Sequence, residues 1–83
     1  MAETLGDRIR MHRARLHMTQ TQLAERIGVS LTTISAIETG QTDPRVSRIA
    51  AIADALGVSV DYLLGRRESW SEFLPTMQQL VPA

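Results

Sequence analysis

The reactive side chains of this 83-residue sequence form no catalytic or metal-binding pattern. His12 and His17 are five residues apart, so they do not share one face of a helix, and no metal-spaced carboxylates accompany them. The absence of cysteine excludes disulfides, thiolate catalysis and cysteine-ligated zinc. Because no glycine-rich phosphate loop, nucleophile elbow or triad is visible, we expect no enzyme, no metal site and no cofactor.

A group of hydroxyl and apolar side chains suits binding better than catalysis. Thr32 and Ser35 can donate or accept hydrogen bonds, whereas Leu31 and Ala36 offer apolar surface. A polar stretch at residues 39–42 follows them. Whether these groups face one partner depends on the helices that present them.

The composition predicts one small helical domain. The chain is too short for two cores, and 43% hydrophobic with 22% charged residues is typical of a folded protein. Aromatic residues make up only 4%, so the core must be aliphatic, which favours helices over strands. No apolar run approaches the roughly 20 residues of a membrane span, and the start of the chain lacks the apolar segment of a signal peptide. We therefore expect a cytoplasmic protein with no membrane partner.

The charge of the chain is balanced in total but uneven in position. Nine arginines, with no lysine, face nine acidic residues, and this balance taken alone argues against nucleic acid and against a polybasic membrane anchor. Residues 1–48, however, hold seven arginines and five acids, a net charge of +2, whereas residues 49–83 carry −2. Neutrality therefore limits how strongly the chain attracts phosphates without excluding nucleic acid.

Capping signals predict two short helices at the start of the chain. The capping pairs are Thr4 with Asp7 and Thr19 with Gln22. Apolar spacing places the first helix at about residues 5–16, and the second ends at Gly28, a left-handed stop. The inward positions of the first helix are Leu5, Ile9, His12 and Leu16.

Similar signals predict three more helices. Their caps and stops are Ser30 and Gly40, then Gly57, then Ser59 and Gly65. Asp43-Pro44 breaks the chain before the fourth helix. That helix is expected to bury Val46, Ile49, Ile52, Ala53 and Leu56. Since no alternating strand pattern competes, the predicted fold class is all-α, with five short helices.

A three-residue link, Gly28-Val29-Ser30, joins the second and third helices. Such a link forces two short helices to cross steeply, which is the geometry of a helix-turn-helix, and Ala24 is small enough for a close approach. The apolar residues that this crossing brings together are Leu23, Ala24, Ile27, Val29, Ile34 and Ile37. An ordinary αα-hairpin is the alternative.

Motifs inside and outside this unit match the pattern of a known family. They are Thr19-Gln20, Gln22-Leu23-Ala24, Gly28-Val29-Ser30, Ile34-Ser35, Ile37-Glu38-Thr39-Gly40, Pro44, Ile52-Ala53 and residues 56–64. With these motifs the chain resembles the phage repressor/Cro type of helix-turn-helix, often called the Xre family, over about residues 5–65. The resemblance implies a compact five-helix domain at residues 1–65 that binds operator DNA as a homodimer and regulates transcription. His17 stands where the family usually has glycine, so we predict a left-handed backbone there.

The resemblance implies that the third helix, about residues 31–38, enters the major groove of double-stranded DNA. Its base-reading positions are Leu31, Thr32, Ser35 and Ala36. Leu31 has no core to enter, and the methyl group of thymine is an apolar partner for it, although local packing of this leucine is the alternative. No arginine, lysine, asparagine or glutamine lies on this face, so we expect modest direct readout.

Contacts to DNA phosphates are expected from the residues that flank this helix. Gln20 lies in the first turn of the second helix, where free N–H groups and the helix dipole favour an anion. The polar loop 39–42 can offer backbone N–H groups, and Arg45 follows it. The expected phosphate-binding residues are Gln20, Ser30, Thr39, Gln41, Thr42 and Arg45, with Arg10 and Arg48 as weaker candidates. A solvated surface role stays open for each arginine.

The resemblance also implies an ion pair between Arg13 and Glu38 that ties the third helix to the first. Residues 66–83, in contrast, match nothing in the family pattern and form a predicted C-terminal extension. Within it, Ser69 is a possible helix cap, and Pro75 would end or kink that helix. The candidate interface residues of the extension are Trp70, Phe73 and Leu74.

Three roles are open for this extension. It can fold back on its own domain, or it can act as a clasp between the two chains of a homodimer. In the alternative function, an antitoxin-type subunit, it would bind a protein partner.

Overall fold

The computed structural model describes residues 3–65, which form five helices and no strand. The helices are α1 (Leu5–Arg15), α2 (Gln20–Ile27), α3 (Leu31–Glu38), α4 (Val46–Leu56) and α5 (Val60–Leu63). The predicted all-α class with five short helices is confirmed. The predicted extension at 66–83, with its helix cap and its candidate interface residues Trp70, Phe73 and Leu74, lies outside the described residues.

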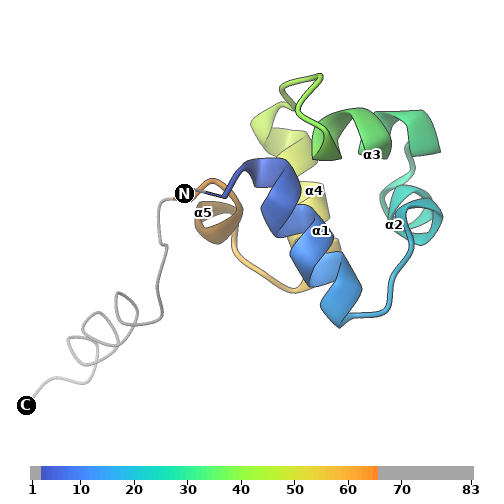
Figure 1. Cartoon of the computed structure of the whole chain (residues 1–83), viewed down its shortest axis with the longest axis horizontal. Coiled ribbons are helices and arrows are strands. Elements are labelled where there is room, and N and C mark those ends of the chain that lie inside the picture. Colours follow the sequence, from blue (N-terminus) through green and yellow to red (C-terminus); the bar gives the residue numbers. More distant parts are fainter. Residues whose placement is uncertain (1–2, 66–83) are drawn as a thin grey trace, which may run out of the picture.

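The helices pack around α1, which lies between α2 and α3 on one side and α5 on the other (Figure 1). α1 contacts α3, α4 and α5, while α2 contacts α3 and α4. Each helix contributes one fully buried large side chain to a single core; these are Ile9, Leu23, Ile34, Ile52 and Leu63. Since burying each of them contributes roughly 1.5–3 kcal/mol, all five helices depend on the same core for their stability.

The helices begin where the capping signals place them. Both predicted capping pairs form capping boxes, because the hydroxyls of Thr4 and Thr19 accept the backbone N–H three positions on, and their own backbone N–H groups donate to the side chains of Asp7 and Gln22. Ser30 and Ser59 cap α3 and α5 through their hydroxyls. α4 has no side-chain cap, since Arg45 occupies that position.

Four helices end with the same backbone turn. At the end of α1, α2, α3 and α4, the N–H after the left-handed residue bonds to the carbonyl five positions earlier, at 2.9–3.0 Å. Glycine fills the left-handed position in three of these turns, but His17, with φ of 55°, fills it after α1. The left-handed backbone predicted for His17 is confirmed.

Three expected core positions are corrected. Leu16 is 50% exposed, because α1 ends at Arg15 and Leu16 already belongs to the turn. Val46 is 66% exposed, since it opens α4 one turn before the buried stretch that starts at Ile49. His12 is half-buried and meets the edge of the Tyr62 ring, with a centroid distance of 4.9 Å, outside the central core.

Candidate nucleic-acid interface

The α2–α3 unit has the predicted helix-turn-helix geometry. Gly28 ends α2 with φ of 76°, and the N–H of Val29 bonds to the carbonyl of Ala24 at 2.9 Å. The Ser30 hydroxyl then accepts the N–H of Thr33 at 3.1 Å, which starts α3 without a further loop residue. Ala24 and Ile34 are buried between the helices, so the turn has one fixed geometry.

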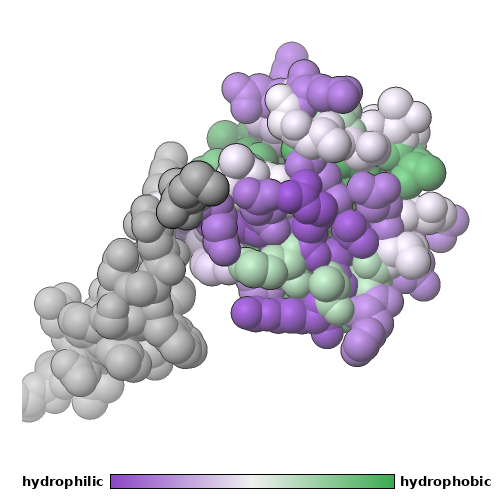
Figure 2. Space-filling model, in the orientation of Figure 1, coloured by the Kyte–Doolittle hydropathy of each residue, from purple (hydrophilic) through white to green (hydrophobic). Residues whose placement is uncertain are grey.

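The start of α3 presents an open surface. Leu31 is 48% exposed and Thr32 is exposed, whereas Ser35 and Ala36 are half-buried. Leu31 borders a shallow hollow at the start of α2, together with His17. Figure 2 shows hydrophobic surface at the edge of the molecule beside this end of α3, while the face over α1 is mostly hydrophilic. The side chains predicted to contact bases therefore lie on the surface and include apolar groups.

The end of α3 is anchored by the buried carboxylate of Glu38. The side chain is 1% exposed, and its two oxygens accept Nε of Arg13 at 2.7 Å and Nη2 at 3.0 Å. Nη1 of Arg13 donates to the carbonyl of Met18 at 2.9 Å. The expected Arg13–Glu38 contact is thus present as a two-pronged ion pair, which joins α1 to α3.

Gln20 belongs to the same cluster. Its Nε2 donates to Oε1 of Glu38 at 2.9 Å, so the first residue of α2 is bonded to the last residue of α3. The sequence interpretation assigned this amide to phosphate and missed the bond. No local signal could have found this bond, because Glu38 lies 18 positions further along the chain than Gln20.

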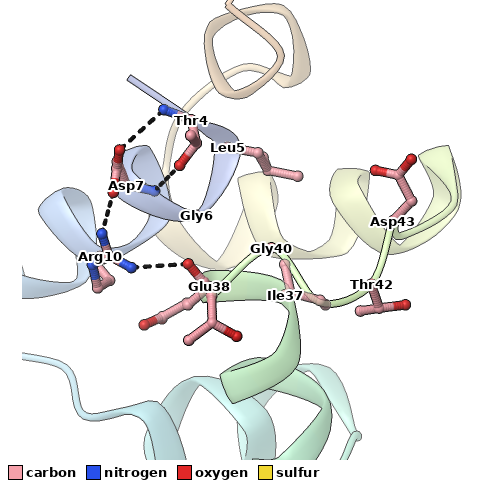
Figure 3. A pocket seen from close by; sticks show the side chains of 11 residues that line it. Thr4, Leu5, Gly6, Asp7, Arg10, Ile37, Glu38, Gly40, Thr42 and Asp43 are labelled. Atoms are coloured by element: carbon pink, nitrogen blue, oxygen red, sulfur yellow. Dashed lines mark hydrogen bonds and ion pairs between the residues drawn. The ribbon is translucent and has the colours of Figure 1, made fainter. Parts of the chain in front are cut away.

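The backbone of Glu38 is held as well, from α1. Nη1 of Arg10 donates to the carbonyl oxygen of Glu38 at 2.8 Å, and Arg10 also pairs with Asp7 (Figure 3). Gly6 packs directly on this segment, since a Cβ there would lie 2.9 Å from Cα of Glu38 and would overlap its carbonyl. The sequence reasoning missed both contacts, and it placed Arg10 among the weaker phosphate candidates.

The surroundings of two titratable groups on α1, Asp7 and His12, lower their pKa values. The backbone N–H and then the hydroxyl of Thr4 lower the pKa of Asp7, because both bonds favour the charged carboxylate. Burial lowers the pKa of His12 below its ordinary value of about 6.5, and the nearby charge of Arg15 acts in the same direction. The Nε2 atom of His12 is buried and has no hydrogen-bond partner.

The loop after α3 offers fewer backbone donors than expected. The N–H groups of Thr39, Gly40 and Gln41 bond to carbonyls within α3, at 3.0, 3.2 and 2.9 Å. The expectation that this whole loop presents N–H groups to a ligand is therefore wrong for these three. Gly40 carried the signal, since a left-handed glycine after a helix directs the following N–H groups back to the helix.

Two arginines after this loop are available for anions. Arg45 is exposed, and within residues 3–65 neither Arg45 nor Arg48 forms an ion pair. Both border one hollow between α3 and the start of α4, beside Thr33 and Ser47. Asp43 lines the same hollow, which therefore brings two basic residues and one acidic residue beside α3.

The described residues offer no site for a metal ion. Between residues 3 and 65 no three histidine, aspartate or glutamate side chains come together as ligands. No helix in the same range has the length and apolar character needed to cross a membrane.

Comparisons with known proteins agree with this geometry. A helix-turn-helix family model matches residues 9–63. The chain is 40% identical over 62 residues to the cryptic phage CTXphi transcriptional repressor RstR of Vibrio cholerae, covering 75% of this chain and 55% of that protein. It therefore spans about half the length of this relative.

Two solved structures have the same fold. The P22 c2 repressor in complex with a synthetic operator is similar with a TM-score of 0.72 and 38% identity, over 76% of this chain and 96% of the other. SinR, a master regulator for biofilm formation solved in complex with DNA, is similar with a TM-score of 0.68 and 31% identity, over 72% of this chain and 97% of the other. The chain belongs to the helix-turn-helix family, in its phage-repressor or Xre branch.

Proposed function

We propose that this chain is a DNA-binding transcriptional repressor that inserts α3 into the major groove of a pseudo-palindromic operator as a homodimer. The observation that carries the proposal is the exposed start of α3, held by a rigid turn and presenting Leu31 to solvent. The family and the two structural neighbours solved with DNA support it.

Base reading is assigned to the exposed side of α3. Leu31 contacts a thymine methyl group, and Ala36 suits the same partner. Thr32 and Ser35 supply hydroxyls that accept or donate at base edges. Because no side chain here reads guanine or adenine with two bonds, thymine positions and DNA shape contribute most of the specificity.

Phosphate contacts are assigned first to the exposed residues beyond α3, namely Gln41, Thr42 and Arg45. The hydroxyls of Ser30 and Thr39 already bond within α3, so they contact a phosphate only through their second hydrogen-bonding position. Few cations are available, and we therefore expect weak nonspecific affinity and a shallow salt dependence.

The homodimer is inferred from the small number of base pairs that one helix-turn-helix can contact. One helix-turn-helix covers too few base pairs for tight specific binding, so two half-sites about one helical turn apart, roughly 34 Å, are expected. The antitoxin-type alternative has no support in the names of the relatives above, and residues 66–83, which would bind its partner, are outside the described part. A non-enzymatic, cytoplasmic protein is part of the same proposal.

Selection of bound sequences from a random duplex library tests the proposal. We expect a palindromic motif with thymines in each half-site and two chains bound per duplex in sedimentation analysis. Recovery of no motif would overturn the regulator assignment, and one chain per selected duplex would overturn the homodimer.

A further inference from the structure

We infer that His17 is a DNA-binding residue, which in its protonated form contacts a backbone phosphate next to the bases that α3 reads. This inference rests on the proposed function. It starts from the backbone of His17, which is left-handed with φ of 55°.

The turn after α1 needs a left-handed residue but does not need a histidine. Glycine fills the equivalent position after α2, α3 and α4, where φ is 76°, 79° and 73°. A side chain in this backbone region is strained, because its Cβ lies too close to a neighbouring carbonyl oxygen, whereas glycine has no Cβ. Histidine at this position therefore lowers the stability of the fold, and strain of this kind points to a function of the side chain.

The side chain of His17 borders the surface that we assign to DNA. It is exposed, and it lines a hollow of about 500 Å³ together with Gln20, Thr21 and Leu31. A base that Leu31 contacts carries its sugar and phosphate at the edge of the groove, so α3 in the groove brings the strand's backbone along the residues that flank it. His17, across the hollow from the start of α3, is one of these flanking residues.

The imidazole of His17 has no partner within the described chain. Between residues 3 and 65 it forms neither a hydrogen bond nor an ion pair. Both ring nitrogens are therefore available to a ligand.

The charged surroundings of His17 are positive overall. His17 also lines a second hollow, beside α2. The charged residues that line its two hollows or precede it closely on the chain are Arg13, Arg15, Glu25 and Arg26. Arg13 is neutralised by Glu38, and the one acid among the four forms no ion pair with His17 within residues 3–65. α3 contributes only Leu31 to these hollows, so no acidic group of α3 faces the imidazole there.

Protonation makes this imidazole a ligand for phosphate. The protonated ring carries a positive charge and donates through both nitrogens, whereas the neutral ring has one donor and one acceptor. Histidine gains this charge between about pH 8 and pH 5, where other ordinary side chains keep theirs. Because a phosphate favours the protonated ring, DNA binding and proton uptake reinforce each other. Affinity for DNA should therefore rise as the pH falls.

The test measures the affinity of the full chain for the duplex recovered by selection and for a scrambled duplex of equal length, at about pH 8 and pH 6. Both affinities should rise about fivefold per bound chain at the lower pH, the size of an exposed ion pair, because a phosphate contact carries no sequence information. The slope of log affinity against log salt should steepen by about 0.9 per chain. His17→Asn tolerates the left-handed backbone but does not titrate, so it should abolish both changes. A pH effect that survives in His17→Asn overturns the inference.

His12→Phe is the matched control, because His12 is the other of the two histidines and packs against Tyr62. This variant should keep the full pH effect on DNA affinity. If the effect disappeared in His12→Phe instead of in His17→Asn, the contact would belong elsewhere and the inference would be wrong.

His17→Gly separates a phosphate contact from a structural role. Glycine relieves the backbone strain, so Tm should rise by about 4 °C, while the affinity at pH 6 should fall about fivefold per chain. A merely structural residue would move stability and affinity in the same direction, so a higher Tm with unchanged or higher affinity overturns the inference. Failure of the proposed function shows separately: a chain that selects no motif but keeps the pH effect overturns the regulator assignment and leaves the contact in place.

Discussion

The two ends of α3 differ in burial and in hydrogen bonding. The start is exposed, is held by the Ser30 cap, and carries Leu31 and Thr32 facing solvent. The end is buried, and Glu38 there is bonded through its carboxylate and its carbonyl to α1 and α2. A helix of only eight residues is therefore fixed at its end while its first turn remains exposed.

The largest effect should come from breaking the buried end. Arg13→Met removes the charged partner but keeps an apolar stem, and leaves Glu38 buried with one donor. We expect a loss of about 3–5 kcal/mol in the free energy of unfolding, measured by urea denaturation followed by circular dichroism. The paired change Arg13→Met with Glu38→Leu should recover most of it, since no charge is then left buried. A single-variant loss below about 1 kcal/mol, as for a surface pair, would show that this end is not the anchor.

A smaller loss should follow from Gly6→Ala. In an ordinary helix this change gains about 0.5–1 kcal/mol, but here the new methyl group overlaps the carbonyl of Glu38. We expect a loss of about 1–3 kcal/mol, because α1 and α3 must move apart. Thermal unfolding measures it, and a rise in Tm would contradict the close packing of these two backbones.

The exposed end should respond in the opposite way. Leu31→Ala combined with Thr32→Ala should change the free energy of unfolding by no more than about 0.5 kcal/mol, because neither side chain is buried. The ratio of specific to nonspecific DNA affinity should fall about tenfold or more, while the slope of affinity against salt stays the same. If the slope changed and the ratio did not, the start of α3 would be a phosphate contact.

The smallest expected effect is on the pH dependence of stability. It comes from His12 on α1, which packs against Tyr62 on α5 and not against α3. The folded chain keeps His12 neutral because burial lowers its pKa, whereas the unfolded chain takes up a proton at about pH 6.5. The stabilising contribution of neutral His12 is therefore complete above pH 6.5 and is lost as the pH falls from there toward the lowered pKa. His12→Phe keeps a ring beside Tyr62 and should flatten the dependence of the urea midpoint on pH between 7.5 and 5.5. A midpoint that falls as steeply in His12→Phe as in the wild type would contradict this role of His12.

Local signals in the sequence predicted the helix limits well. Thr4, Thr19, Ser30 and Ser59 all cap helices, because a cap bonds only to residues within the next three positions. His17 took its left-handed backbone for the same local reason, as it occupies the stop position of a turn that three glycines fill elsewhere. Leu16 and Val46 were misplaced because apolar spacing does not show where a helix stops facing the core.

The candidate site was predicted less evenly. Leu31 and Thr32 are exposed, as the inward pair Ile34 and Ile37 predicts, whereas Ser35 and Ala36 are half-buried. Gln20 was assigned from its place at a helix start, whereas its partner Glu38 lies 18 positions further along the chain. No local pattern announces such a partner, since a glutamine at this position has the same appearance in the sequence whether it faces solvent or a buried acid.

The sequence by itself determined five helices, the caps of four of them, and a helix-turn-helix, because these depend on bonds between near neighbours and on apolar periodicity. The family resemblance added the pair of Arg13 with Glu38, but only the tertiary structure decided what else holds the end of α3: Gly6 and Arg10 against its backbone, and Gln20 at its carboxylate. The physical reason is burial, because a charge removed from water must find its donors wherever the fold brings them, regardless of their distance along the chain.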